Sequence, residues 1–480
     1  MDFSEENIAS IFGHEAAENE DIIKLREYYF KSNIYSQVSN TLPIRILVGH
    51  KGIGKSALFS VSIDEDSQNG RLSVLIKPDD IIGIGEDIED FLKLIREWKS
   101  GIIKIISEKI LKSYNLYNDG WERNLASMGG KVIAFLQASL KAPESLNLQP
   151  TQKAIIQDFL NNGKIYVYID DLDRGWQGRK RDIIKISALL NAIRDITTEN
   201  TGVCFRISLR SDVYYLVRTS DESTDKIEGS VVWYSWTNHE ILAMLVKRIQ
   251  QYVGKSRSAE ELMQLNQNIL ASYLDEVISP TFNGRGKWEN IPTYRMLMSL
   301  IRKRPRDLVK LCTLAAKKAR SKKSNIIGTN EFSEIFEEYS QGRLQDTINE
   351  YRSELPDIER LLLGMKPSKR EKKASESYVY TSDSLIRKLK DIQQTGRFKF
   401  AKGEVADERS LAAFMYKINF LTARKDKDTF IERKYFEESR YLSNTFVDFG
   451  FDWEIHPAYR WALQPESIED IFLQMKPSAE

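Results

Sequence analysis

Short runs of consecutive apolar residues alternate, in the first half of the chain, with stretches in which apolar residues recur at helical spacing. The apolar runs occupy residues 44–48, 72–76, 164–169, 203–209 and 230–235. Runs of this length between polar segments are typical of parallel strands that are covered on both faces. Between the third and fourth runs, residues 180–197 carry apolar side chains in helical register. This alternation predicts an α/β fold with a wound parallel sheet.

Further helical patterns lie around and between these strands. Residues 87–114, 121–141 and 152–160 each carry an apolar helical stripe, so we expect a helical insertion at about residues 86–160. Residues 12–30 show the same spacing just before the first strand, and we expect that segment to be helical and to pack against the sheet domain.

The second half of the chain is mainly helical in pattern. Strand-like runs become rare from about residue 293, and helical patterns flank the sequence KRPRDLVKLC, in which Pro305 suits the first turn of a helix. The polar and strongly basic segment 366–377 indicates a domain boundary. Beyond it, helical patterns at residues 382–392 and 407–421 precede mixed residues and a short helix at 456–463. This order predicts a winged-helix-like module.

Composition narrows the classes of function. The chain has 480 residues, enough for two or three domains, and its formal net charge of +1 creates no overall field that would attract nucleic acid or anionic lipid. It contains no run of eighteen apolar residues, and its acidic start lacks an export signal, so we expect a cytoplasmic protein without contact to a membrane. Its two cysteines and four histidines are dispersed, which argues against a metal cluster or a disulfide.

The segment GHKGIGKS directly follows the first apolar run and fits the phosphate-binding pattern G-x-x-x-x-G-K-[S/T]. Its glycines leave room for backbone N–H groups to turn toward a phosphate, and the helix after it directs the positive end of its dipole there. Lys55 is expected to reach the β- and γ-phosphates, and Ser56 to bind Mg²⁺. The expected contacts to nucleotide comprise Gly49, His50, Lys51, Gly52, Ile53, Gly54, Lys55, Ser56 and Ala57.

Two acids follow the apolar run KIYVYI, where a strand end would deliver them to the phosphate loop. Asp170 is expected to bind Mg²⁺ together with Ser56, and Asp171 to polarise the water that attacks the γ-phosphate. The alternative is a pair of solvated or capping acids, because aspartate is common at strand ends. Asp173 and Arg174 extend the motif to DDLDR, and a structural ion pair explains them equally well.

The chain resembles a bacterial family of stand-alone P-loop ATPases, related to the STAND and KAP NTPases of the AAA+-like group, in the segments FGHEAAENE, GHKGIGKSA, YIDDLDRGW, ISLRSDVYYLV, KRPRDLVKLC and FDWEIHPAYRWAL. The resemblance implies an ATPase core at residues 1–255, a helical lid at 256–365 and a winged-helix-like domain at 378–480. Such proteins often act as switches or motors in conflict and antiviral systems.

The resemblance also assigns roles to single residues. Arg210 is similar in position to the sensor arginine that monitors the γ-phosphate, and Arg306 to the second sensor on the lid. The alternatives are a surface arginine at a strand end for Arg210 and a simple ion pair for Arg304 or Arg306. His14 stands where relatives often have arginine, so the contact that this arginine makes is in doubt here. KAP relatives often carry membrane helices in the insertion, which is too charged here to span a bilayer.

Two functions of different classes follow. The first is an ATP- and Mg²⁺-dependent hydrolase that acts as a molecular switch, forms a homo-oligomer and controls a separate effector protein, in antiphage defence by resemblance. The alternative is a nucleotide-regulated nucleic-acid-binding protein that acts through its C-terminal domain and the basic residues 366–373. GTP is disfavoured because no N-K-x-D motif occurs, and a small-molecule kinase lacks an identifiable acceptor pocket.

Overall fold

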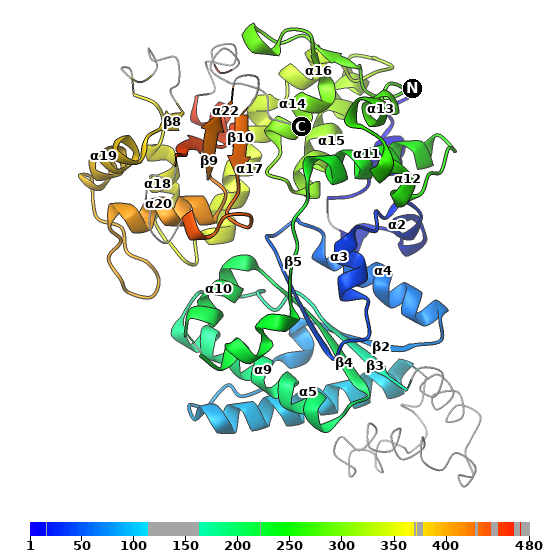
Figure 1. Ribbon diagram of the computed structural model, residues 1–480, viewed down its shortest axis with the longest axis vertical. Coiled ribbons are helices and arrows are strands. Elements are labelled where there is room, and N and C mark those ends of the chain that lie inside the picture. The colour runs from blue at the N-terminus through cyan, green and yellow to red at the C-terminus, as the bar shows by residue number, and fades with distance from the viewer. Residues whose placement is uncertain are drawn as a thin grey trace.

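A computed structural model describes residues 1–15, 17–113, 163–220, 222–368, 371, 378–427, 431–442, 450–464 and 471 (Figure 1). The helices expected at residues 121–141 and 152–160 lie outside this part of the chain. Most of the basic segment 366–377 also lies outside it.

Five parallel strands form the central sheet of the first domain. They are β1 (Ile44–Val48), β2 (Leu72–Ile76), β3 (Ile165–Ile169), β4 (Val203–Leu209) and β5 (Val231–Trp233), in the spatial order β2-β3-β4-β1-β5. Each strand lies within one of the apolar runs, and the predicted α/β fold with a wound parallel sheet is confirmed.

Helices cover both faces of this sheet. On one face, α5 (Phe91–Ser113), α9 (Lys180–Glu199) and α10 (Ser211–Ser220) share a buried apolar cluster with alternate side chains of the strands, such as Ile46 and Val48 of β1. On the other face, α4 (Lys55–Gln68) and α11 (Asn238–Tyr252) pack in a second cluster that includes Leu47. The strands are thus buried on both sides, which explains their continuous apolar character.

The register of the strands brings the loop after β1, the acids after β3 and the end of β4 to the carboxyl edge of the sheet. Val48 pairs with Leu209, and Ile169 pairs with Ile207. Since β4 lies between β1 and β3, its carboxyl end separates the loop after β1 from the acids after β3. Ligands of open parallel sheets bind at this edge.

The helical part that follows contains a long bundle and one short hairpin. The hairpin pairs β6 (Thr281–Phe282) with β7 (Ile291–Pro292). The helices are α12 (Ala259–Gln264), α13 (Gln267–Ser272), α14 (Thr293–Leu300), α15 (Pro305–Ser321), α16 (Thr329–Ser333), α17 (Phe336–Tyr351) and α18 (Ile358–Gly364). Pro305 is the first residue of α15, where its missing N–H costs no hydrogen bond.

The C-terminal part is built on a four-stranded antiparallel sheet. Its strands β8 (Val379–Tyr380), β9 (Leu421–Asp426), β10 (Ile431–Lys434) and β11 (Asp452–Ile455) have the order β10-β9-β11-β8. Between β8 and β9 lie α19 (Ser382–Gln393) and α20 (Glu408–Lys417), and α22 (Arg460–Leu463) follows β11.

Two expected helices were wrong in extent. The helix expected over residues 407–421 ends at Lys417, because Asn419 adopts a positive φ of 57° and Leu421 already begins β9. The segment 12–30 is not one helix, because Gly13 has a φ of 74° between α1 (Glu5–Phe12) and α2 (Ile22–Tyr28). A side chain at Gly13 would also meet Arg248 and Glu20 at 2.6 Å.

Candidate functional site

The loop between β1 and α4 adopts a conformation that its glycines make accessible. Gly52 and Gly54 have φ angles of 77° and 108°, in the left-handed region that other residues rarely adopt. A Cβ atom at Gly52 would also lie 3.0 Å from Cβ of Arg306 at the start of α15. The loop is therefore closely packed against the helical part of the chain.

Lys55 directs its ammonium group into the ring of this loop. Its Nζ donates to the carbonyls of Gly49 (2.7 Å) and His50 (3.1 Å). An ammonium has three donors, so one is left for an anion. Burial lowers the pKa of Lys55, and the nearby Asp173 and Asp170 oppose this effect. Gly54 caps α4 without a side-chain hydrogen bond, which leaves the first N–H groups of this 14-residue helix available to an anion.

A cavity of about 630 Å³ adjoins the loop, which is a usual size for a small-molecule site. Its lining comes from the N-terminal segment after α1, the loop with α4, the acids after β3, the end of β4, the residues after β5, the helix α11, and the ends of the helices α15 and α17. Its aromatic lining consists of Tyr28, Tyr29, Phe30, Trp176, Tyr234 and Trp236. Aromatic rings, which suit a flat base, thus share the lining of this cavity with cations and acids.

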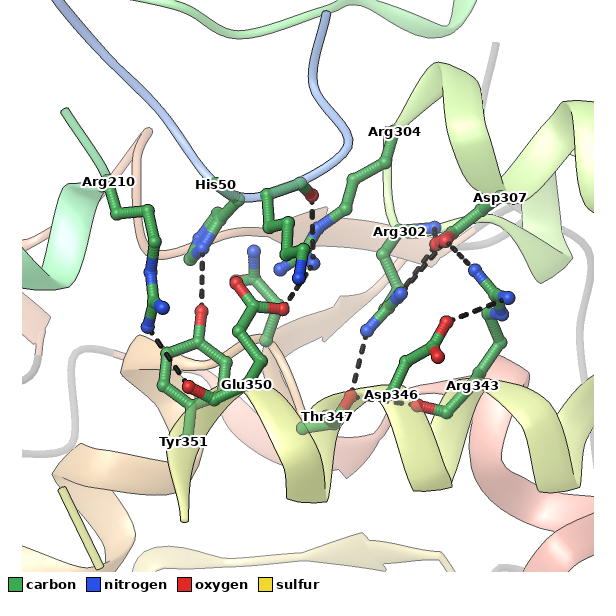
Figure 2. Close-up of polar contacts among 12 residues, drawn as sticks. His50, Arg210, Arg302, Arg304, Asp307, Arg343, Asp346, Thr347, Glu350 and Tyr351 are labelled. Atoms are coloured by element: carbon green, nitrogen blue, oxygen red, sulfur yellow. Dashed lines mark hydrogen bonds and ion pairs between the residues drawn. The ribbon is translucent and has the colours of Figure 1, made fainter. Parts of the chain in front are cut away.

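The expected nucleotide contacts do not all face this cavity. Its lining includes Lys51, Gly52, Gly54, Lys55, Ser56 and Ala57, but not Gly49, His50 or Ile53. The side chain of His50 is buried and its Nδ1 lies 3.0 Å from the hydroxyl of Tyr351 on α17 (Figure 2). Ile53 is also buried, and its carbonyl accepts a hydrogen bond from the indole of Trp236.

Asp170 and Ser56 both line the cavity, as a site for Mg²⁺ would need. The carboxylate of Asp170 accepts hydrogen bonds from the hydroxyl of Ser208 and from the backbone N–H of Asp171, the latter at 2.9 Å. Within the described residues, no three His, Cys, Asp or Glu side chains gather as a metal cluster. The two oxygen donors still fit Mg²⁺, since this ion usually takes one or two protein ligands and completes its shell with phosphate and water.

The other acids of DDLDR differ in their surroundings. Asp171 has a positive φ of 60°, and its carboxylate accepts a hydrogen bond from Nε of Arg174 at 2.8 Å near the surface. Asp173 is more enclosed and lies 3.6 Å from Nη1 of Arg210. Burial raises the pKa of Asp173, while Arg210 and Lys55 oppose this effect. Asp173 thus lines the cavity and pairs with Arg210, as the structural alternative for this acid expects.

Arg210 follows β4 and lies in the cavity wall between the loop and Asp173. Its guanidinium makes a bidentate pair with Asp212 at 3.0 and 2.6 Å and donates to the carbonyl of Glu350 at 3.2 Å. Burial would lower the pKa of Arg210, but Asp212 and Glu350 hold it well above its ordinary value. Arg210 is therefore a buried, fixed cation rather than a surface residue.

The two arginines of RPRDL contact the phosphate loop in different ways. Arg306 lines the cavity, its backbone N–H lies 3.4 Å from the carbonyl of Gly52, and its Nε donates to the carbonyl of Glu15. Arg304 is buried, and its Nη1 lies 3.4 Å from the carbonyl of Lys51. In the described part of the chain, Nε and Nη2 of Arg304 have no hydrogen-bond partner. Both arginines thus link the start of α15 to the loop.

A buried ion cluster fixes the turn that presents these arginines (Figure 2). The carboxylate of Asp307 accepts from Nε and Nη2 of Arg302, at 2.7 and 2.8 Å, and from Nη1 of Arg343 at 2.9 Å. Burial alone would raise the pKa of Asp307, but the two arginines hold it well below its usual range. Sequence reasoning missed this acid, whose only signal is its place within RPRDL.

Replacement of Asp307 by asparagine is expected to lower the free energy of unfolding by about 3–5 kcal/mol, because two buried guanidinium groups lose their shared carboxylate. Urea unfolding monitored by tryptophan fluorescence measures this change. The matched control is Asp346→Asn, which removes the exposed partner of the same Arg343 and should cost less than about 1 kcal/mol. Equal losses in both variants would refute a special role for Asp307.

Comparisons with known proteins add three kinds of likeness. The model of a family described as the FunZ-associated C-terminal helical domain matches residues 239–348. The putative transposon gamma-delta 80.3 kDa protein of Escherichia coli (strain K12) is 24% identical over an alignment that covers 96% of this chain and 69% of that protein.

Two solved structures show a weaker likeness to this chain. A Walker-type ATPase of Pyrococcus abyssi is 12% identical, with a TM-score of 0.39 over 86% of this chain and 95% of that one. The ORC2 protein of Aeropyrum pernix in its ADPNP–ADP complexes is 9% identical, with a TM-score of 0.38 over 94% and 92% of the two chains. At these TM-scores the likeness assigns no function to this chain.

In the part of the chain that the structure describes, no helix combines the length and the apolar character that crossing a membrane requires.

Proposed function

We propose that this chain binds Mg·ATP and hydrolyses it. The observation that carries the proposal is that Lys55, the N-terminus of α4 and the acid Asp170 line one cavity whose wall also contains aromatic rings. Triphosphate would lie along the loop, and Ser56 and Asp170 would hold the magnesium ion. Bound Mg²⁺ would neutralise charge on the phosphates, while the chain supplies the donors and the enclosure.

Calorimetric titration with Mg²⁺ and a slowly hydrolysed ATP analogue, paired with an assay of phosphate release from ATP, tests this proposal. We expect saturable heat with the analogue and phosphate release that requires Mg²⁺. A purified, folded chain that gives neither signal would exclude an ATPase.

For the acid that polarises the attacking water we propose Asp171, with Asp173 as the alternative. Asp171→Asn is expected to retain nucleotide binding and to lower turnover by at least about 100-fold, as loss of a general base does. Single-turnover phosphate release measures the effect, with Asp173→Asn as the matched variant two residues away. Native turnover in Asp171→Asn together with a large loss in Asp173→Asn would transfer the role to Asp173.

The positions of Arg210 and Arg306 support a switch. Both line the cavity, one from the sheet domain and one from the first turn of α15, so that bound phosphate would have a cation on each side. We propose that Arg210 and Arg306 act as the two sensors. We also propose the division into an ATPase core at residues 1–255, a helical lid at 256–365 and a C-terminal domain at 378–480.

We further propose a switch of the STAND/KAP type that forms a homo-oligomer and controls a separate effector, in antiphage defence. The support is the sequence resemblance described above. Light-scattering mass measurements with and without the slowly hydrolysed analogue test it. A mass that rises with nucleotide supports assembly, and an unchanged mass contradicts it.

A second candidate function, nucleotide-regulated binding of nucleic acid, is favoured by the order of elements in the C-terminal part. The chain order is α18, β8, α19, α20, β9, β10, β11, and β11 pairs between β8 and β9; apart from the additional edge strand β10, this order matches that of a winged helix. Lys390, Arg397, Lys399 and Lys402 are exposed on α19 and the loop after it, without an ion pair to any described carboxylate. Neutralising these four cations should flatten the dependence of DNA binding on salt, and an unchanged slope would exclude this surface.

A further inference from the structure

The turn after β10 connects the C-terminal part to the nucleotide domain. We call residues 435–440 the docking turn. Four of its side chains reach other parts of the chain: Phe436 lies edge-on to Tyr215 of α10, Glu437 pairs with His50 of the phosphate loop, Glu438 pairs with Lys303 before α15, and the guanidinium of Arg440 lies 3.7 Å from the ring centre of Trp233 in β5. One short turn thus contacts the sheet, the phosphate loop and the base of α15.

His50 is the member of the phosphate loop that this turn holds. Its imidazole is buried, and its Nδ1 lies 3.0 Å from the hydroxyl of Tyr351 and 3.2 Å from that of Ser211. Its Nε2 pairs with the carboxylate of Glu437. The carbonyl of the same residue accepts from Nζ of Lys55. Residues outside the phosphate loop therefore hold the imidazole of His50, while the backbone carbonyl of His50 accepts a hydrogen bond from Lys55 within the loop.

Glu437 is built into this contact as a buried, ionised group. Only 9% of its side chain is exposed, and the amide of Asn419 lies 3.3 Å from its Oε2. Burial would raise the pKa of Glu437, but His50 and the nearby Arg304 lower it to about 2. Since a buried charge without partners is costly, the docking turn and the phosphate loop are expected to keep or lose their contact as a unit.

We propose that Glu437 is a positioning residue through which the C-terminal part holds the phosphate loop in the shape that receives a triphosphate, so that nucleotide binding and docking of this turn stabilise each other. The proposal rests on the proposed function of the loop. The physical basis is pre-organisation, because a loop fixed before binding loses less entropy on binding. Linkage makes the effect reciprocal, so bound nucleotide must strengthen the contact of the docking turn to the same degree.

Hydrogen exchange on the full-length wild-type chain tests this reciprocity. The slowly hydrolysed ATP analogue with Mg²⁺ is expected to slow amide exchange in the peptide that contains residues 435–440, at least threefold. A contact with a merely structural role would not respond to nucleotide. Nucleotide binding seen by calorimetry without any change at the docking turn overturns the proposal and leaves the proposed function standing, whereas absence of binding removes both.

Variants of the two neighbouring glutamates supply the second measurement. Glu437→Ala is expected to weaken binding of the analogue about 10-fold by loss of pre-organisation, and Glu437→Gln, whose amide oxygen still accepts from His50, about threefold. The control Glu438→Gln removes the partly exposed charge pair to Lys303, while its amide oxygen can still accept from the backbone N–H of Tyr435, and it should stay within twofold of wild type. Equal affinities in Glu437→Ala and Glu438→Gln would contradict the positioning role.

Discussion

Replacement of Lys55 by alanine is expected to weaken the binding of ATP at least about 100-fold, because the site loses charge-assisted hydrogen bonds worth about 1.5–3 kcal/mol each. The ammonium already lies inside the ring of the loop, held by two backbone carbonyls, so little rearrangement is needed for it to meet phosphate. Fluorescence titration with a labelled adenine nucleotide measures the loss.

Lys93 offers a matched control for this variant. It is an exposed lysine on α5, and Lys93→Ala should bind nucleotide as the wild type does. Circular dichroism of both variants verifies that the fold is retained. Tight binding by a folded Lys55→Ala variant would show that phosphate is held elsewhere.

The second large effect is expected at Asp170. Asp170→Asn should lower Mg²⁺-dependent turnover by at least about 100-fold, because an amide neither carries the charge that attracts the ion nor stabilises the charged transition state. Binding of nucleotide in the presence of EDTA should stay close to that of wild type, since asparagine can keep the hydrogen bond to Ser208. Comparing titrations with Mg²⁺ and with EDTA separates the two effects.

Asp79 supplies the control acid. It is exposed after the neighbouring strand β2, so Asp79→Asn changes the same chemical group outside the cavity. Native turnover in Asp170→Asn would refute the metal role. A loss of nucleotide binding in EDTA that equals the loss in Mg²⁺ would indicate structural damage instead.

The sheet and its phosphate loop could be predicted because their signals are local. Continuous apolar runs identify buried parallel strands, and the spacing of Gly49, Gly54 and Lys55 reflects the geometry of one turn. Asp170 and Arg210 directly follow two such strands. The predicted strand ends therefore indicated that both residues lie at the same edge of the sheet, as the structure shows.

The contacts around the loop could not be predicted, because they join distant segments. His50 pairs with Glu437, which lies in the C-terminal part of the chain, and nothing in GHKGIGKS indicates which acid will pair with its imidazole. The partner of Asp307 is likewise distant in sequence, because Arg343 of α17 donates a hydrogen bond to its carboxylate. The break in the segment 12–30 occurs at Gly13, where a positive φ and the nearby Arg248 leave no room for a side chain. Periodicity describes which face of an element is apolar, but it does not identify the partners of a buried charge.

The most direct test of the account is a crystal structure of the full chain with Mg²⁺ and a slowly hydrolysed ATP analogue. We predict that the β-phosphate lies within the loop between β1 and α4, beside Nζ of Lys55, and that the metal contacts Ser56 and Asp170 directly or through water. Nucleotide found outside this cavity, or a loop that holds no phosphate at saturating ligand, would contradict the central claim.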